Sequence, residues 1–205
     1  MFITFEGGEG CGKSTQSKLL KKYLESKGYK VILTLEPGGT KIGEKIRKAL
    51  LRGSKLVSKY SELFLFAADR TEHIESVIKP ALKAGKIVIS DRFTDSTTAY
   101  QSGGRKLPYR LVRYVNEISS GGMVPDLTFL LDVNPTLGIS RGTRYSKKDK
   151  FESENGGFHD RVRRTYHNIA KFEPRRVRII STSATVKETR NTIRRIVNEK
   201  LRNKK

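Results

Sequence analysis

Short apolar runs rich in β-branched side chains recur along the chain, as expected for buried strands. Between them lie longer segments in which apolar residues follow the spacing of a helix. In the first of these segments, Leu19, Leu20, Tyr23 and Leu24 fall on one helical face. The predicted strands span residues 2–5, 30–35, 86–90, 127–132 and 177–181.

The helical segments alternate with these strands. Strand, helix and strand in this order are typical of a parallel sheet that is covered by helices on both faces. No repeat and no low-complexity linker divides the chain, so we expect one α/β domain over residues 1–205. A break near Arg70 in the third predicted helix is left open. The predicted helices span residues 16–28, 42–51, 60–84, 108–119, 135–142, 158–172 and 186–203.

Residues 143–157 interrupt this alternation. Their sequence, TRYSKKDKFESENGG, is polar, charged and weakly periodic. We therefore expect a mobile lid in this part of the chain, and with the two residues that open it the predicted lid spans 141–157.

Length and composition indicate in which compartment of the cell the protein works. A chain of 205 residues can bury a sizeable core as one domain, and no apolar run approaches the roughly 18 to 20 residues of a membrane span. The N-terminus lacks the pattern of a signal peptide, so we expect a cytoplasmic location and no membrane partner. The one cysteine excludes an internal disulfide and a zinc cluster built on cysteines, which fits a reducing compartment.

The net charge is strongly positive, at +21. Such a charge attracts nucleic acid, anionic membranes and phosphorylated small molecules, and charge alone does not choose among them. Much of the excess follows residue 140, in the runs RGTRYSKKDK, RVRRTY, PRRVR and KLRNKK. A solvated basic surface is the simplest interpretation of the last run, and a partner or membrane contact is the alternative.

A glycine-rich stretch, GGEGCGKST, separates the first predicted strand from the first predicted helix. It matches the P-loop pattern in the strand-to-helix context that the pattern requires. Glycines let backbone N–H groups converge on phosphate oxygens, and the following helix adds the positive end of its dipole. Lys13 would bring a point charge to the β- and γ-phosphates, and the Ser14 hydroxyl would ligate Mg²⁺. The stretch therefore predicts a triphosphate site.

Cys11 occupies a variable position of this loop, and the simplest interpretation is that it fills space without a chemical role. The helix N-terminus and Lys13 nevertheless favour a thiolate. On that basis alkylation of Cys11 would inhibit the protein, and bound nucleotide would protect it.

Three further segments lie at or near the ends of predicted strands, where ligands of a parallel sheet bind. EPGGT places the carboxylate of Glu36 before a glycine turn. In DRF, Asp91 can hold the water shell of a metal ion and Arg92 can fork onto a phosphate. In LFLFAADR, Phe66 and Arg70 lie one helical turn apart and can line the same pocket.

These segments, together with DSTTAYQSGGR and PDLTFLLDV, make the chain resemble the bacterial-type thymidylate kinase family along essentially its whole length. The resemblance implies a P-loop NTPase fold with a five-stranded parallel sheet flanked by helices, and a homodimer. It implies transfer of the γ-phosphoryl group of ATP to dTMP with Mg²⁺, which gives dTDP and ADP in dTTP biosynthesis. Despite the net charge of +21, we do not expect a nucleic-acid partner.

The resemblance also implies roles in the acceptor pocket. Phe66 would stack on thymine, and Arg70 and Thr97 would hydrogen-bond the base. Tyr100 would crowd the 2′ position of the sugar and favour deoxyribose, and Gln101 would complete the pocket. The implied substrate-binding set is Glu36, Phe66, Arg70, Arg92, Thr97, Tyr100 and Gln101.

On the phosphate side, Arg92 would bind the acceptor phosphate, and Glu9 would approach the sugar 3′-hydroxyl or a metal-bound water. In bacterial-type members, lid arginines replace an arginine that other members carry in the P-loop. Residues 8–11 contain no arginine, whereas Arg141 and Arg144 open the predicted lid, and which of these two acts is left open. The implied catalytic set is Glu9, Lys13, Arg92, Arg141 and Arg144, and the implied metal ligands are Ser14 and Asp91.

Small residues follow the last predicted strand, where the family holds adenine, so Ser183 and Ala184 are expected to line that site. The implied set for ATP is Gly7, Gly8, Glu9, Gly10, Cys11, Gly12, Lys13, Ser14, Thr15, Ser183 and Ala184.

Two positions depart from the family pattern. Leu35 stands where bacterial-type members usually carry arginine, and Asp149 and Lys150 stand where they carry Asp-Arg. Lysine keeps the charge and loses the bidentate fork. The departures therefore predict a weaker hold on phosphate, or compensation by Arg47 or Arg105.

Two rival functions remain open. Another nucleoside monophosphate kinase would share the P-loop and differ in its base pocket. A P-loop ATPase acting on nucleic acid would fit the charge, but the chain is small and lacks an aromatic and basic stacking motif for single strands.

Overall fold

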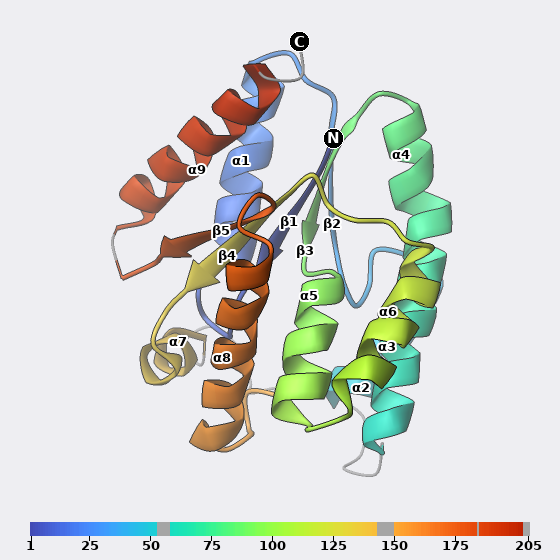
Figure 1. Cartoon of the computed structure of the whole chain (residues 1–205). Helices are drawn as coiled ribbons and strands as arrows, with labels where there is room; N and C mark the ends of the chain where they lie inside the picture. Colours follow the sequence, from blue (N-terminus) through green and yellow to red (C-terminus); the bar gives the residue numbers. More distant parts are fainter. Residues whose placement is uncertain (53–57, 143–149, 184, 203–205) are drawn as a thin grey trace.

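A five-stranded, all-parallel sheet forms the centre of the molecule, with the strand order β2-β3-β1-β4-β5 (Figure 1). The computed structural model describes residues 1–52, 58–142, 150–183 and 185–202. This sheet confirms the predicted α/β class. The strands are β1 (Phe2–Glu6), β2 (Val31–Leu35), β3 (Ile87–Asp91), β4 (Leu127–Asp132) and β5 (Val177–Ser181).

Helical segments fill the connections between the strands. Within the described residues, none of them is long and apolar enough to cross a bilayer. Two of the segments, η1 (Ile74–Ile78) and η2 (Thr98–Gly104), have the wider π-helical turn. The α-helices are α1 (Lys13–Ser26), α2 (Lys41–Arg52), α3 (Lys59–His73), α4 (Lys79–Lys83), α5 (Thr94–Thr97), α6 (Tyr109–Ser120), α7 (Pro135–Gly142), α8 (Gly156–Phe172) and α9 (Val186–Arg202).

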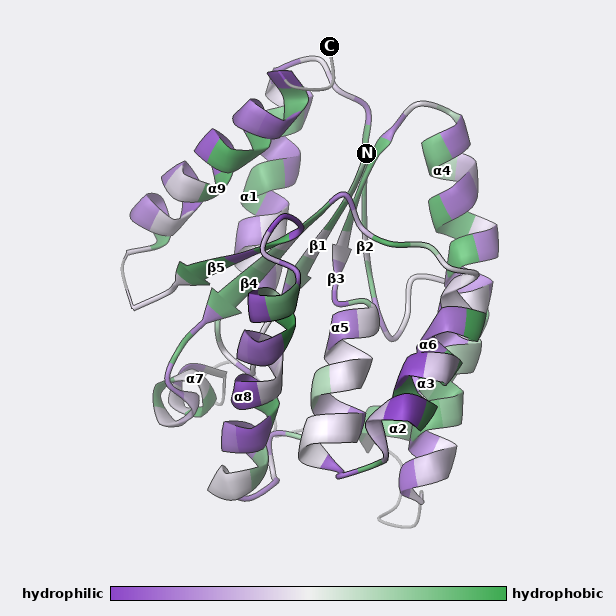
Figure 2. Cartoon of the chain, viewed as in Figure 1, coloured by the Kyte–Doolittle hydropathy of each residue, from purple (hydrophilic) through white to green (hydrophobic). Residues whose placement is uncertain are grey.

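Both faces of the sheet are apolar, and successive side chains of each strand serve opposite faces. Ile3 and Phe5 belong to the core that packs under α1 and α9, whereas Phe2 packs with Ile74 and Ile78 of η1. Figure 2 shows the result, with hydrophobic strands in the middle and helices that turn hydrophilic residues outward. β1 is buried along its whole length, which fixes the segment that leads into the P-loop.

The predicted helix at 60–84 is nearly continuous, and its irregularity lies beyond Arg70. It consists of α3, η1 and α4 in succession, so the chain changes its helical turn at residues 74–78 instead of breaking near residue 70. α8 begins at Gly156, two residues before the predicted start at 158. The predicted lid is described only at 141–142 and 150–157, and residues 143–149 lie outside the described part of the chain.

The segment at 94–104 is helical, and the sequence pattern did not predict it. Its threonines, serines and glycines are weak helix formers. Packing against α8 stabilises it instead, because a side chain at Gly103 would collide with Thr165 and one at Gly104 would collide with Phe158. The close approach of η2 and α8 shapes the wall of the site described next.

Candidate functional site

The P-loop connects β1 to α1 in a conformation that only glycine adopts easily. Gly7 has a φ of 136° and Gly12 a φ of 94°, and a side chain at Gly7 would collide with the carbonyl oxygen of Leu131. Lys13 folds back over the loop, and its Nζ donates to the carbonyl oxygens of Gly7 at 3.1 Å and Gly8 at 2.7 Å. The loop therefore holds its lysine close to the backbone turn, where a phosphate site requires a positive charge.

Cys11 is buried beneath the loop, where Nζ of Lys13 lies 3.5 Å from its Sγ. Its side chain is 2% exposed and belongs to the core cluster that contains Leu131 and Val133. The lysine is thus beside the thiol, as the alkylation hypothesis requires, but the burial limits access of a reagent to the sulfur.

We expect alkylation of Cys11 by iodoacetamide to proceed on the order of 10²-fold more slowly in the native protein than in denaturant, because a buried thiol reacts only after local opening. Mass spectrometry of timed samples measures both rates. Equal rates in the two conditions would show that the thiol is accessible.

A cavity of about 500 Å³ joins the P-loop to the ends of β2 and β3, and its size suits a mononucleotide. It brings together most of the predicted site residues. These are Glu9, Gly10, Gly12, Lys13, Ser14, Thr15, Glu36, Phe66, Arg70, Asp91, Arg92, Thr97, Tyr100, Gln101 and Arg141.

Some predicted residues lie elsewhere. Gly7 and Gly8 line a small second cavity of about 20 Å³ behind the loop, and the exposed Ser183 lines neither cavity. Arg144 and Ala184 lie outside the described residues.

Arg92 lies at the junction of β3 and α5 with a φ of 77°, a left-handed conformation that is uncommon for a side-chain-bearing residue. Its Nη2 donates to Oε1 of Glu9 at 2.7 Å, and its guanidinium lies 4.9 Å from the centre of the Tyr100 ring. The Tyr100 hydroxyl donates to the same Glu9 oxygen at 2.6 Å. The P-loop, the end of β3 and η2 are thus joined around the guanidinium of Arg92.

The carboxylate of Glu9 stays charged in this setting. Burial by itself would raise its pKa, but the positive charges of Arg92 and Lys13 and the hydrogen bond from Tyr100 outweigh burial and lower the pKa to about 2.

Arg70 is 1% exposed and held by three partners on three different segments. Nε donates to Glu36 at 3.0 Å, Nη1 to Asn116 at 2.9 Å and Nη2 to Thr97 at 2.8 Å. A guanidinium has five N–H donors, so one remains on each terminal nitrogen. His73 adds a second bond to Glu36, from Nδ1 at 3.0 Å. The arrangement fixes the direction in which the two remaining donors point.

Asp69 lies next to this cluster and accepts a hydrogen bond from the backbone N–H of Gly38 at 2.9 Å. Burial and the nearby charge of Glu36 raise its pKa to about 7, well above the ordinary value of 3.8. The bond ties the EPGGT turn to α3.

Ser14 and Asp91 meet at the edge of the cavity, where Oγ of Ser14 donates to Oδ2 of Asp91 at 2.5 Å. A hydroxyl and a carboxylate are the hard oxygen ligands that suit Mg²⁺, which completes its shell with phosphate and water in nucleotide sites. Among the described residues, no group of three or more His, Cys, Asp or Glu side chains could hold a metal ion alone. The residues present therefore fit a metal ion that binds together with a nucleotide.

The structure also shows the contacts of three basic residues that lie near the phosphate side of the site or near the departures from the family pattern. Arg141, at the end of α7, donates to the carbonyl of Thr182 at 3.0 Å. Arg47 lines the cavity with Leu35 and donates to the carbonyl of Pro37 at 2.8 Å. Lys150 ion-pairs with a buried glutamate of α3.

Glu6, at the end of β1, is a buried carboxyl that the sequence did not single out. The backbone N–H of Phe93 donates to Oε1 at 2.7 Å, and the hydroxyls of Ser96 and Tyr166 donate to Oε2. Burial and the charge of Asp95 raise the pKa of Glu6 to about 8.

We expect the stability of the protein to fall relative to a Glu6→Gln variant as the pH rises from about 5 to about 8. In this window the unfolded chain has released the Glu6 proton while the folded chain keeps it, so stability decreases with a slope that approaches about 1.4 kcal/mol per pH unit. Urea melts of both proteins across the window measure the difference. Parallel stability curves would contradict the raised pKa.

Sequence reasoning missed three other residues of this region, Glu62, His73 and Asn116, which are 7% exposed or less. Asn116 carried a usable signal, since it lies one helical turn after the buried Val112 and so puts an amide on an apolar face. Glu62 and His73 gave no comparable signal, because their partners come from distant segments.

Comparison with known proteins agrees with this geometry. The thymidylate kinase family model matches residues 5–193. A thymidylate kinase of Dehalococcoides mccartyi is 50% identical over 204 residues, which cover 98% of each chain. One from Maridesulfovibrio salexigens is 44% identical over 210 residues, covering 98% of this chain and 97% of the relative. The crystal structure of thymidylate kinase from Ehrlichia chaffeensis superposes with a TM-score of 0.79 at 37% identity, covering 97% of this chain and 98% of that one.

The family model, the full-length relatives and the solved structure all point to the same family, and the P-loop cavity is consistent with it. The chain therefore belongs to the thymidylate kinase family.

Proposed function

We propose that the protein transfers the γ-phosphoryl group of ATP to dTMP and releases dTDP and ADP. The observation that carries this proposal is the cavity itself. One end is the P-loop with Lys13, and the other end holds the buried Arg70 beside Phe66. A donor phosphate site and a small aromatic pocket with aimed hydrogen-bond donors thus share one space, as a nucleoside monophosphate kinase requires.

In the acceptor pocket, Phe66 supplies a ring face for the base, and the two remaining Arg70 donors meet an exocyclic carbonyl oxygen. Thr97 holds the Arg70 guanidinium on its other side and borders the base edge. Tyr100 lies against Arg92 and Glu9, where the sugar connects base to phosphate.

The phosphates need positioning and charge cancellation more than covalent help from the protein. Arg92 holds the acceptor phosphate, and Lys13 holds the donor phosphates. Arg141 lines the cavity from α7 and adds a third positive charge. Bound at Ser14 and Asp91, Mg²⁺ would neutralise negative charge on the phosphoryl oxygens. No general base is assigned, because the acceptor phosphate oxygen is itself the nucleophile.

Product analysis tests the proposal. Purified protein is incubated with Mg²⁺-ATP and each of dTMP, dUMP, dCMP, UMP, CMP, AMP and GMP, and diphosphates are quantified by chromatography. We expect dTDP to dominate and to disappear with Arg92→Ala. Turnover of another monophosphate in preference to dTMP would show that this other nucleotide is the phosphoryl acceptor. Hydrolysis of ATP only when nucleic acid is added would overturn the kinase proposal.

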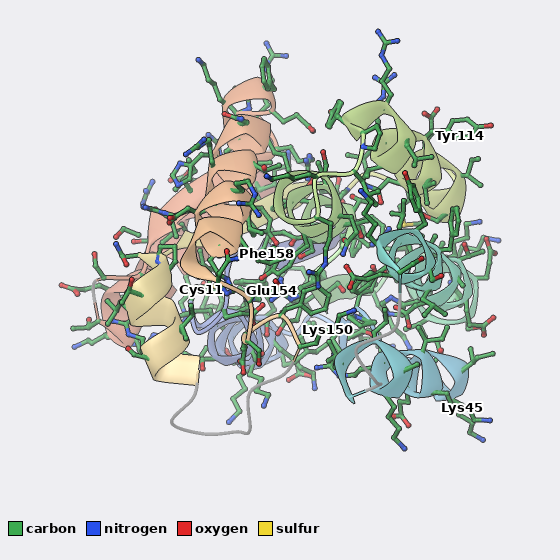
Figure 3. The ribbon with its side chains drawn as sticks, turned by 90° about the horizontal axis from the view of Figure 1, so that it is seen from below. Cys11, Lys45, Tyr114, Lys150, Glu154 and Phe158 are labelled. Atoms are coloured by element: carbon green, nitrogen blue, oxygen red, sulfur yellow. The ribbon has the colours of Figure 1, made fainter. Side chains whose placement is uncertain are left out.

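We also infer that the protein is a homodimer joined through α3 and α6. These two helices pack side by side and expose an apolar ridge. The ridge consists of Tyr60 and Phe64 on α3 and of Tyr114 and Ile118 on α6, each of them 44% exposed or more. Figure 3 shows Tyr114 at the outer edge of the molecule. A ridge of this kind on two paired helices suits burial against a second copy.

We expect a Phe64→Glu variant to be monomeric by light scattering at concentrations where the parent chain is dimeric, because a charge at the centre of the ridge would be buried without a partner. Phe172→Glu is the matched control, since Phe172 is 81% exposed on α8. A monomeric parent chain, or a variant that stays dimeric, would exclude this interface.

A further inference from the structure

Glu62 is a buried carboxylate behind the acceptor pocket. Its side chain is 1% exposed, and side chains from two other parts of the chain converge on it. Gln101 of η2 donates from Nε2 at 3.1 Å, and Arg105 donates from Nε at 2.9 Å. Lys150 donates from Nζ at 2.8 Å, after the part of the lid that lies outside the described residues. Figure 3 shows Lys150 near the centre of the molecule, away from the ridge that carries Tyr114.

The two cations keep Glu62 ionised. Burial by itself would raise its pKa, but hydrogen bonds from Arg105 and Lys150 outweigh burial and lower the pKa below its ordinary value. An ionised carboxylate can only accept hydrogen bonds. Any neutral side chain that contacts it must therefore present a donor.

This requirement fixes the orientation of the Gln101 amide. The edge of the amide that faces Glu62 must be its NH₂ group, because a carbonyl oxygen there would meet a second acceptor. Gln101 is 1% exposed and lines the cavity, so its Oε1 and its second N–H are the groups left for a ligand. The Gln101 amide therefore offers a ligand one acceptor and one donor that lie side by side.

Pyrimidine bases differ in the donor and acceptor groups that they would present to this amide. Thymine and uracil carry an N3–H donor next to the O4 acceptor, and this pair matches an amide that offers an acceptor and a donor. Cytosine carries an N3 acceptor next to the N4 amino donor, and this pair matches only the inverted amide. Inversion of Gln101 would turn its oxygen toward the buried Glu62 carboxylate and place two acceptors against each other.

We propose that Glu62 is a positioning residue for base selection, which locks the Gln101 amide in the orientation that accepts thymine or uracil and rejects cytosine. This inference rests on the proposed function, since it requires a pyrimidine monophosphate in the acceptor pocket. The locking acts by fixing an amide that would otherwise rotate, and it needs no contact between Glu62 and the substrate.

Glu62→Gln is the direct test, because it keeps the shape and removes one acceptor. Arg105 donates to both oxygens of Glu62, so the Lys150 ammonium, which donates to Oε2 alone, draws the remaining oxygen to that position. The new NH₂ group then lies at the position of Oε1, where it faces Gln101 and Nε of Arg105. Gln101 then turns its own oxygen toward residue 62. We expect the ratio of kcat/KM for dTMP to that for dCMP to fall at least about tenfold in this variant.

Lys150→Met is the matched control, because it removes one cation from Glu62 and leaves the bond to Gln101 in place. We expect its dTMP to dCMP ratio to stay within about twofold of the parent value. A purely structural role for Glu62 would lower turnover of dTMP and dCMP in parallel and leave the ratio of the Glu62→Gln variant unchanged, which would overturn the proposal.

A second variant covers the case in which Glu62→Gln does not fold. Gln101→Met keeps Glu62 and removes the amide, and it is expected to lose the same discrimination. An unchanged ratio in this variant, or efficient turnover of dCMP by the parent chain, would also overturn the inference. Failure of the parent chain to phosphorylate dTMP is a different result, since that outcome refutes the proposed function itself.

Discussion

Replacing Lys13 with methionine is expected to lower kcat for dTDP formation by about 10³-fold or more. Methionine matches the length of lysine and removes the charge, so the donor phosphates lose the cation that the P-loop presents to them. The parent lysine is 7% exposed and bonded to the carbonyls of Gly7 and Gly8, which shows that it is already held at the loop. Coupled measurement of ADP release under saturating dTMP gives kcat directly.

The control for this change is Lys18→Met, which removes an exposed lysine from the same helix. We expect the control to keep kcat within about twofold of the parent chain. A Lys13→Met variant that retained more than about one tenth of the parent kcat would exclude the proposed role of this lysine. Thermal melts of both variants separate loss of chemistry from loss of folding.

Replacing Arg70 with methionine is expected to destabilise the protein by about 3–5 kcal/mol and to raise the KM for dTMP. The variant leaves Glu36, which is 3% exposed, without its main counter-charge. It also removes the two free donors that we assign to the base. Urea unfolding measures the first effect, and initial rates at varied dTMP concentration measure the second.

A double variant separates these two effects. Adding Glu36→Gln to Arg70→Met removes the unpaired buried charge, so we expect most of the lost stability to return while the high KM for dTMP remains. Arg195→Met is the matched control for losing an arginine ion pair, because Arg195 pairs with Glu199 on the exposed side of α9. Recovery of KM along with stability would mean that Arg70 has no direct contact with the base.

The sequence predicted those features whose signal is local. β4 and β5 have the predicted bounds, and the P-loop lies between β1 and α1 as its pattern requires. Each of these signals sits within a few consecutive residues, where apolar runs and glycine spacing express backbone geometry directly. The cavity residues were predicted partly from such local motifs and partly through the resemblance to known kinases, and the geometry brings most of them together.

The features that the sequence did not predict depend on pairs distant along the chain. Arg70 is held by partners 34, 46 and 27 residues away, and Lys150 meets Glu62 across 88 residues. No periodicity encodes such a pair, because the fold creates it. For the same reason, no pattern along the chain indicated that Lys150 would pair with α3.

The glycines at 103 and 104 have a consequence for the order in which the site is assembled. They let η2 approach α8, and Arg161 of α8 donates to their carbonyls across 58 and 57 residues. The turn of the P-loop, by contrast, is closed by residues near one another in sequence, since Lys13 bonds back to Gly7 and Gly8. Because long loops must close before distant contacts form, we expect the turn of the P-loop to form before η2 packs on α8. Tyr100 and Gln101 belong to η2, so we expect the wall of the acceptor pocket to be completed later in folding than the P-loop turn.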